Sequence, residues 1–270
     1  RTWTCSETKG LRMARRESYS IHERRIEALR VKDKSTEDRQ VMDEVFDKET
    51  LLAIYKLMTD KIVETVELPI STGKEGKVFL CTSPDKRLLA LKIYRISNST
   101  FKRIARYIEG DPRFKGLTGN HRKMIFAWAS KEFKNLQRLD SAGVRVPSPI
   151  RSYRNLLAME YIGTEEAPAP MLRDVKLGNP EKTYKTVVKF VKLAYKKAQL
   201  VHGDLSEYNV LVQDDKPVLI DCGQAMMVDH PNASEFLRRD IVNLNRYFGS
   251  IGVEVIDHEE LFRMVTGGAK

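Results

Sequence analysis

The pattern of apolar and polar positions divides the chain into a strand-rich part followed by a helical part. Short apolar segments bounded by turn residues predict strands at 62–70, 77–81 and 88–93, then a hairpin at 149–153 and 156–161. Ahead of them, apolar residues at helical spacing between positions 41 and 65 predict one or two helices. The same spacing later predicts helices at 121–140, 181–200, 233–248 and 259–265.

The hairpin is followed by the most marked break in this pattern. Met159-Glu-Tyr-Ile-Gly163 ends an apolar strand with a glycine, and the Pro-rich stretch 165–170 comes next. Such a break predicts a hinge between two lobes. We therefore assign residues 1–40 to an N-terminal arm, 41–163 to a first lobe with the hinge, and 164–270 to a second lobe.

Composition sets the class of protein. The 270 residues are 41% hydrophobic and 31% charged, which is typical of a soluble globular chain. No apolar run approaches the roughly 18 residues of a membrane span, and no secretory signal pattern is expected at the N-terminus. Three widely separated cysteines, Cys5, Cys81 and Cys222, fit neither a zinc motif nor a disulfide framework. We expect a cytoplasmic protein without a membrane partner.

The charge favours an anionic partner. The net charge is +10, and the basic residues are dense in the first 36 positions, where a solvated tail and an RNA-contacting arm explain them equally well. Five lysines follow one another at helical spacing: Lys182, Lys185, Lys189, Lys192 and Lys196. A solvated face is the commoner explanation of such a stripe. None of the five has an acidic residue four positions later, which keeps RNA phosphate binding open.

The strongest chemical pattern lies in the second lobe. Asp204 precedes Asn209 by five residues, the D-x-x-x-x-N spacing of a phosphoryl-transfer catalytic loop. After an intervening strand, Asp221-Cys-Gly223 has the form of the metal-binding turn that follows such a loop. The alternative, two polar turns capping a hairpin, is less favoured because three upstream features also fit.

The first of these features is a loop between the first two predicted strands. The stretch Ser71-Thr72-Gly73-Lys74-Glu75-Gly76-Lys77-Val78 aligns with G-x-G-x-x-G-x-V, with serine at the first glycine position. Small residues let the backbone approach phosphate oxygens. The stretch lacks the spacing, the hydroxyl residue and the helix of a Walker loop. Taken alone, it would predict only a hairpin turn.

The other two features are a lysine and a glutamate. Lys92 lies inside the apolar strand at 88–93, where an unpaired charge is costly, so we expect it to hold phosphate. The alternative is an edge-strand lysine that points to solvent. Glu132, beside the apolar side of the helix at 121–140, is its natural partner, although a surface glutamate is also open. The long connection at 97–120 is expected to be mobile and to contact substrate or nucleotide.

Together these residues resemble the RIO family of atypical serine protein kinases, and Ser71-Thr-Gly-Lys-Glu75 and Ala167-Pro-Ala-Pro170 resemble its type-1, archaeal-like branch. The resemblance covers roughly residues 41–265. It implies a two-lobed, α+β, protein-kinase-like fold whose second lobe lacks the activation segment and peptide-docking helices, since we expect no room for them in the 47 residues after Gly223.

The resemblance also implies roles. Asp204 would be the catalytic aspartate, Asn209 and Asp221 would hold Mg²⁺ (with Mn²⁺ as an alternative ion), and Asp240 would brace the catalytic loop. Asp221 is also implied as a residue that accepts phosphate. Adenine would pair with backbone groups of Glu160 and Ile162. The remaining residues implied in ATP binding are Ser71, Thr72, Gly73, Lys74, Glu75, Gly76, Val78, Lys92, Glu132 and Met159.

Two functions remain open. The first is a Mg-ATP-dependent serine/threonine protein kinase with ATPase and autophosphorylating activity, acting in maturation of the small ribosomal subunit. The second is an ATP-gated assembly factor that binds ribosomal RNA or protein and uses hydrolysis only for release. A small-molecule phosphotransferase shares a similar His-Gly-Asp loop but needs a larger helical lobe. The pre-small ribosomal subunit is the expected partner, and a monomer is favoured.

The sequence also departs from its relatives. Gly76 and Lys77 replace the Ala-Asn that is more usual in this branch, which predicts a looser phosphate loop. Gly203 replaces the arginine through which ordinary kinases respond to a phosphorylated activation loop, and Ser206 replaces a lysine that contacts the γ-phosphate. We therefore expect no such switch and inefficient phosphorylation of free peptides.

Overall fold

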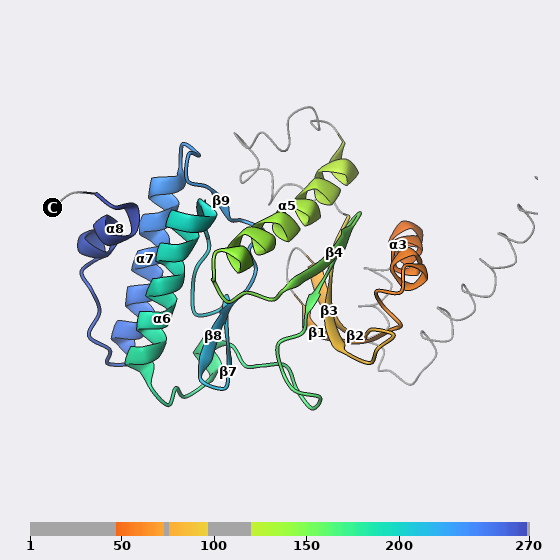
Figure 1. Ribbon diagram of the computed structural model, residues 1–270, viewed down its shortest axis with the longest axis horizontal. Coiled ribbons are helices and arrows are strands. Elements are labelled where there is room, and N and C mark those ends of the chain that lie inside the picture. Colours follow the sequence, from red (N-terminus) through yellow and green to blue (C-terminus); the bar gives the residue numbers. More distant parts are fainter. Residues whose placement is uncertain (1–46, 73–75, 97–119, 269–270) are drawn as a thin grey trace, which may run out of the picture.

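A computed structural model describes residues 47–72, 76–96 and 120–268 and shows two lobes, one around a sheet and one mostly helical (Figure 1). The basic arm, the segment 41–46 and the connection at 97–119 lie outside these ranges. So do three of the predicted phosphate-loop residues, Gly73, Lys74 and Glu75. What the sequence predicts for these segments stays a prediction.

The first lobe is built on a five-stranded, fully antiparallel sheet in the order β1-β2-β3-β5-β4. Its strands are β1 (Thr65–Thr72), β2 (Gly76–Thr82), β3 (Leu88–Tyr94), β4 (Pro149–Tyr153) and β5 (Leu156–Glu160). Helix α3 (Lys48–Thr59) covers one face, where a small core includes Leu57, Phe79 and Ile93. Because side chains alternate along a strand, the cross-strand pair Val78 and Lys92 faces the opposite side, toward the second lobe.

Two predictions for this lobe need correction. The first strand begins at Thr65 rather than at residue 62, because α3 ends at Thr59 and the chain turns through Lys61, whose φ is 57°. The same strand continues through Ser71 and Thr72, which the sequence placed in the phosphate loop. In the described part of the region 41–65 there is one helix, which is within the prediction of one or two, and it ends at Thr59.

Helix α5 (His121–Ser141) connects the two lobes. It crosses between the sheet and the helices of the second lobe (Figure 1). Its buried side chains Trp128, Ala129 and Leu136 belong to one large core that continues into the second lobe. The side chain of Asn120 caps its first turn by accepting a hydrogen bond from the Lys123 N–H. Movement of α5 would therefore disturb both lobes.

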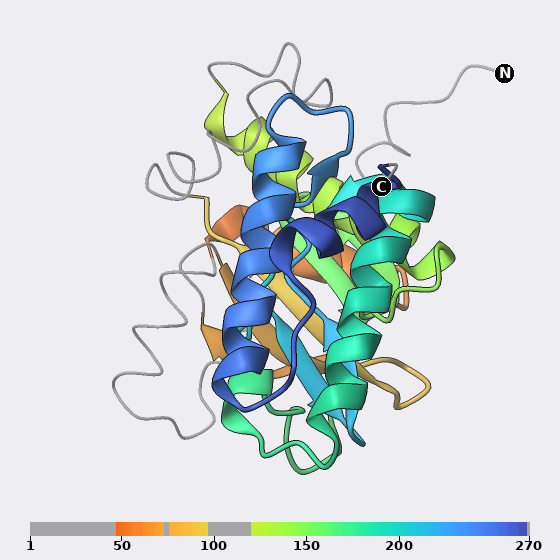
Figure 2. The same cartoon turned by 90° about the vertical axis from the view of Figure 1, so that its left-hand side faces the viewer.

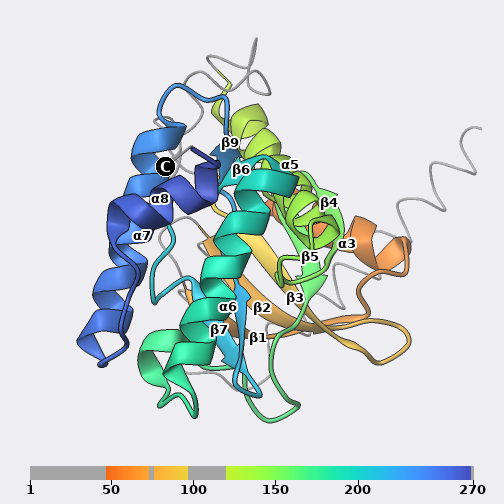
Figure 3. The ribbon, with the colours of Figure 1, turned by 60° about the vertical axis from the view of Figure 1, so that its left-hand side comes forward.

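The described part of the second lobe contains three α-helices, a short 3₁₀-helix, a π-helical segment and two small sheets. The elements are η2 (Leu172–Asp174), α6 (Pro180–Leu193), η3 (Ala194–Ala198), α7 (Ala233–Ser250) and α8 (His258–Thr266), with the antiparallel pairs β6 (Leu200–Val201) and β9 (Met226–Met227), and β7 (Val210–Gln213) and β8 (Lys216–Leu219). Helix α8 lies between α6 and α7 on the outer side of the lobe (Figures 2 and 3). In the part of the chain that the structure describes, none of the helices is long and apolar enough to cross a membrane.

The helix predicted at 181–200 is correct up to Leu193 and needs correction after it. The α-helix ends at Leu193, a five-residue π-helical segment follows at Ala194–Ala198, and Gln199 closes it with φ of 56°. The apolar spacing continues through this segment, so the pattern cannot reveal the change of helix type. The left-handed residue redirects the chain into β6, which leads directly into the predicted catalytic loop.

Candidate active site

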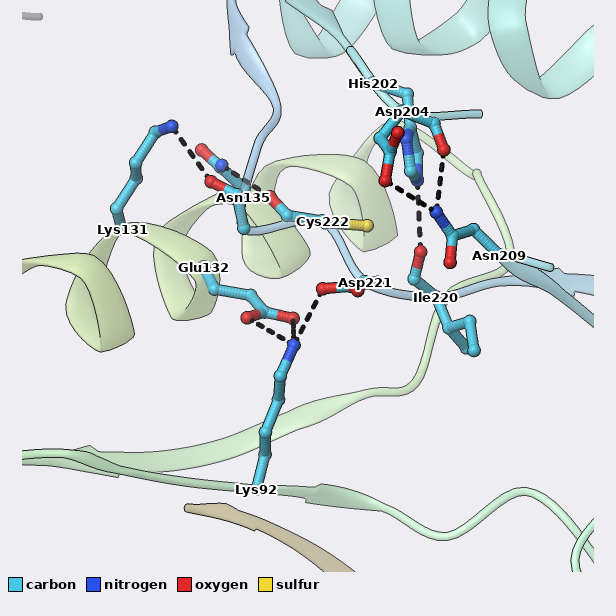
Figure 4. Close-up of polar contacts among 11 residues, drawn as sticks. Lys92, Lys131, Glu132, Asn135, His202, Asp204, Asn209, Ile220, Asp221 and Cys222 are labelled. Carbon is cyan, nitrogen blue, oxygen red and sulfur yellow. Dashed lines mark hydrogen bonds and ion pairs between the residues drawn. The ribbon is translucent and has the colours of Figure 1, made fainter. Parts of the chain in front are cut away.

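An ion cluster joins β3, α5 and the turn after β8 at the boundary between the lobes (Figure 4). The Nζ atom of Lys92 lies 2.9 Å from both carboxylate oxygens of Glu132 and 2.8 Å from Oδ1 of Asp221. The Glu132 side chain is 1% exposed and that of Lys92 is 11% exposed. The predicted pairing of Lys92 with Glu132 is present, and the two alternatives, a solvent-facing lysine and a surface glutamate, are wrong.

Each charge in the cluster stabilises the charged form of its partner. Burial alone would lower the pKa of Lys92, but the charges of Asp221 and Glu132 raise it above its ordinary value. The Lys92 charge likewise holds the pKa of Asp221 below its ordinary value, against the effect of burial. Lys92 therefore stays cationic and Asp221 stays anionic at neutral pH, as a phosphate ligand and a metal ligand require.

Asp221 has an unusual backbone. Its φ of 58° is in the left-handed region, which aspartate tolerates better than most residues but which still needs support from its surroundings. Lys92 contacts Oδ1, and among the described residues no contact engages Oδ2. The next residue, Cys222, is fully buried, and burial raises the pKa of its thiol, which disfavours the reactive thiolate.

The predicted catalytic loop places Asp204 and Asn209 beside that turn (Figure 4). Nδ2 of Asn209 donates to the backbone carbonyl of Asp204 at 2.7 Å and to its Oδ2 at 3.1 Å. Burial raises the pKa of Asp204 above its ordinary value, which strengthens this carboxylate as a proton acceptor. Since Nδ2 of Asn209 is engaged by Asp204, its Oδ1 is the atom available to a metal ion.

Helix α7 braces the catalytic loop from behind, as the resemblance implied for Asp240. The two carboxylate oxygens of Asp240 accept the N–H of Gly203 at 2.8 Å and that of Leu205 at 2.9 Å. Asp240 is 1% exposed, and burial raises its pKa to about 6. The guanidinium of Arg239 donates to the carbonyl of Gly203. Gly203 itself has φ of 79°, a conformation that an arginine at this position would adopt only with strain.

The predicted hinge contains an ion pair of its own. Arg145 contacts both carboxylate oxygens of Glu160 at 2.6 Å, so this side chain braces the hinge. The Glu160 N–H donates to the Ser148 carbonyl, and the Ile162 carbonyl accepts from the Ala169 N–H. The Glu160 carbonyl and the Ile162 N–H remain the backbone groups that we predict for pairing with an adenine edge. Met159 pairs with Ala90 of β3 and is partly buried.

The described part of the predicted phosphate loop is continuous with the sheet. Gly76 approaches β3 so closely that a Cβ atom there would lie 2.4 Å from the Ile93 carbonyl oxygen. Val78 lies on the same face as Lys92, so the two side chains border the same space. Ser71 and Thr72 come from the neighbouring strand β1, where Ser71 pairs with Val78.

Sequence reasoning missed three residues at this site. Lys131 and Asn135 of α5 are buried and bind backbone carbonyls of the Asp221 turn. His202 contacts the Ile220 carbonyl at 3.1 Å and so ties the catalytic loop to the strand end before Asp221. The signal for Asn135 was present in the sequence: a polar residue interrupts the apolar side of its helix between Ala129 and Leu139.

The architecture is that of a protein kinase: an antiparallel lobe with the Lys92–Glu132 pair, then the predicted hinge, and a lobe that carries the predicted catalytic loop and the Asp-x-Gly turn. A family model of the RIO domain matches residues 77–261. The chain is 43% identical to the RIO-type serine/threonine-protein kinase Rio1 of Haloferax volcanii over 262 residues, which cover 97% of this chain and 88% of that protein. The chain belongs to the RIO family.

Other similarities agree. The human serine/threonine-protein kinase RIO1 is 37% identical over 248 residues, 90% of this chain and 43% of the human protein. The Rio2 kinase of Chaetomium thermophilum superimposes with a TM-score of 0.62 at 25% identity, covering 81% of this chain and 68% of that one. A complex of Rio2 from the same organism, described as ADP/Mg²⁺-phosphoaspartate, superimposes equally well at 24% identity and shows the shared fold.

Proposed function

We propose that this protein transfers the γ-phosphoryl group of Mg-ATP to serine or threonine hydroxyls of proteins, including its own. The observation that carries the proposal is the convergence of Lys92, Glu132, Asp221, Asp204 and Asn209 on one boundary between the lobes. The names of the Rio1 relatives, which are serine/threonine-protein kinases, support the same reaction.

The residues present fit a magnesium ion bound together with nucleotide. Mg²⁺ prefers hard oxygen ligands and is usually held by one or two protein groups plus phosphate oxygens. Asn209 Oδ1 and Asp221 Oδ2 provide two such groups, and no cluster of three or more His, Cys, Asp or Glu able to hold a metal by itself occurs in the described part of the chain. Asn209 and Asp221 would hold the ion, and the positive charge it supplies would neutralise phosphate oxygens. Manganese has the same ligand preference and could substitute.

Each protein group then has one task. Lys92, held by Glu132, would bind phosphate oxygens, and the Glu160 carbonyl and Ile162 N–H would orient the adenine. Asp204 would accept the proton of the attacking hydroxyl while the bond from the γ-phosphorus to ADP breaks. Rate acceleration would come from positioning and charge neutralisation, because the protein needs no covalent step.

The chemical stability of transferred phosphate tests this reaction. Protein is incubated with Mg²⁺ and γ-labelled ATP, with and without small ribosomal subunit precursors, and then treated with acid or hydroxylamine. Acid-stable label on serine or threonine, absent in Asp204→Ala, is expected. Label that hydroxylamine removes would instead indicate an acyl phosphate on Asp221, comparable to the phosphoaspartate of the Rio2 complex. No label and no free phosphate under any condition would overturn the proposal.

A second candidate function is an ATP-gated factor that binds RNA, and the lysine stripe along α6 and η3 favours it. Lys182, Lys185, Lys189 and Lys196 are exposed, Lys192 is partly exposed, and none of the five forms an ion pair with another residue that the structure describes. At about 1.5 Å per residue the stripe spans roughly 20 Å. Beside its first three lysines lies an open hollow of about 520 Å³. In this role the expected partner is RNA of the maturing small ribosomal subunit.

Salt dependence of RNA binding tests this candidate. The triple variant Lys185→Gln/Lys189→Gln/Lys196→Gln removes three exposed cations. The control, Lys61→Gln/Lys123→Gln/Lys134→Gln, removes three exposed cations from the other lobe. With about 0.7 counterions released per single-strand phosphate, the first variant should reduce the slope of log K against log salt by about 2. Equal slopes for both variants would rule out the stripe as the RNA-binding surface.

A further inference from the structure

The turn that carries Asp221 is held by two buried polar side chains of helix α5 that have no task in the transfer itself (Figure 4). Lys131 Nζ donates to the carbonyl of Gly223 at 2.9 Å. Asn135 Nδ2 donates to the carbonyls of Cys222 and Ala225 at 2.9 and 3.1 Å. Lys131 is 1% exposed and Asn135 is fully buried. Three backbone carbonyls of one short turn therefore accept hydrogen bonds from side chains of a single helix.

The backbone of the turn is also in close contact with side chains of the helix. A Cβ atom at Gly223 would lie 3.1 Å from Nε1 of Trp128 and 3.2 Å from Oε2 of Glu132, so a side chain there would force its neighbours to move. Nζ of Lys131 lies 4.5 Å from the centre of the Trp128 ring, in cation–π range. Burying an ammonium group is costly, and these contacts offset the cost only while the turn stays against the helix.

Neighbouring residues of helix α5 thereby fix both Lys92 and the turn that carries Asp221. Glu132 holds Lys92, and its neighbours Lys131 and Asn135 hold the residues on the C-terminal side of Asp221. The left-handed backbone of Asp221 is a strained conformation that persists only when its surroundings determine it. The hydrogen bonds that Lys131 and Asn135 donate to the carbonyls of the following residues hold Asp221 in this conformation.

We propose that Lys131 and Asn135 are positioning residues that hold the Asp221 carboxylate beside Lys92 before nucleotide binds. The site is then preorganised, because α5 cannot move away without breaking the Lys92–Glu132 pair and three buried hydrogen bonds together. This inference rests on the proposed function only in taking Asp221 as the metal ligand.

Hydrogen exchange of the nucleotide-free protein tests the inference without any activity. Lys131→Met and Asn135→Leu keep the approximate volume of each side chain and remove its donors. Each should raise the exchange rate of the segment 220–226 at least tenfold, while the sheet of the first lobe keeps its wild-type rate. Lys134→Met is the matched control, since Lys134 is on the same helix but exposed. Wild-type exchange of 220–226 in both buried-site variants would overturn the proposal.

The wild-type protein provides a measurement that does not depend on whether the variants fold. If α5 holds the turn, the segment 220–226 should exchange as slowly as the neighbouring strands β7 and β8 in the absence of nucleotide. Exchange as fast as that of the exposed turn at Asp214 and Asp215 would contradict the proposal.

Magnesium-dependent binding of ADP separates this inference from the proposed function. In Lys131→Met, the Mg²⁺ concentration that gives half-maximal tightening of ADP binding should rise about tenfold, equivalent to about 1.4 kcal/mol. A merely structural role would lower the melting temperature and leave this concentration unchanged, which would overturn the positioning role. If wild-type protein binds ADP without any magnesium effect, it is the proposed function that fails.

Discussion

Replacement of Lys92 by methionine is the perturbation whose cost follows most directly from the structure. The substitution leaves two carboxylates facing each other, and the carboxylate of Glu132 is 1% exposed. Removing one partner of a buried ion pair typically costs about 3–5 kcal/mol. Because the Asp221 side chain is 41% exposed and can be solvated, we expect the lower end, about 3 kcal/mol.

Urea unfolding and thermal melting measure this cost. At about 2–4 °C per kcal/mol, a loss of about 3 kcal/mol lowers the melting temperature by roughly 6–12 °C. The double variant Lys92→Met/Glu132→Gln should recover at least about 1 kcal/mol relative to the sum of the single changes, because it removes the uncompensated charge.

A matched control is Lys86→Met, which breaks the exposed ion pair of Lys86 with Glu64 and should cost less than about 1 kcal/mol. The reasoning is refuted if the free energy of unfolding of Lys92→Met lies within about 0.5 kcal/mol of that of the control. It is also refuted if the double variant is no more stable than the sum of the two single changes predicts.

Two further predictions concern the carboxylates of Asp221 and Asp240. Asp221→Ala should abolish the tightening of ADP binding by Mg²⁺, measured by calorimetry, and unchanged magnesium dependence would exclude Asp221 as a ligand. For Asp240, the pKa raised to about 6 means that the folded state binds the proton more tightly than the unfolded state. Its contribution to stability is therefore greatest below pH 4 and falls as the pH rises toward 6. Asp240→Asn lacks this titration, so the stability advantage of wild type over the variant should shrink between pH 4 and 6; an advantage that stays constant or grows would contradict the assignment.

The sequence predicted the elements that depend on short-range patterns. The strands at 77–81 and 88–93 and the helix at 121–140 are present within one residue of their predicted ends. The pairing of Lys92 with Glu132 was also predictable, because a lysine within an apolar strand requires a partner.

Features set by tertiary contacts were not predictable. The helix after Pro180 changes to a π-helical segment at Ala194, and apolar spacing does not encode that change. The anchoring of the Asp221 turn by Lys131 and Asn135 joins residues about 90 positions apart, and a single sequence does not reveal such a pairing.

The most direct test of the account is a single-turnover experiment with Asp204→Ala. Protein in excess over γ-labelled Mg-ATP is sampled over time for loss of label from ATP, and ADP affinity is measured on the same preparations. The account predicts that transfer slows by about 10²–10⁴, the usual contribution of a general base, while the dissociation constant for ADP changes little. Transfer at the wild-type rate in this variant would contradict the central claim that Asp204 is the catalytic group of a phosphoryl-transfer site.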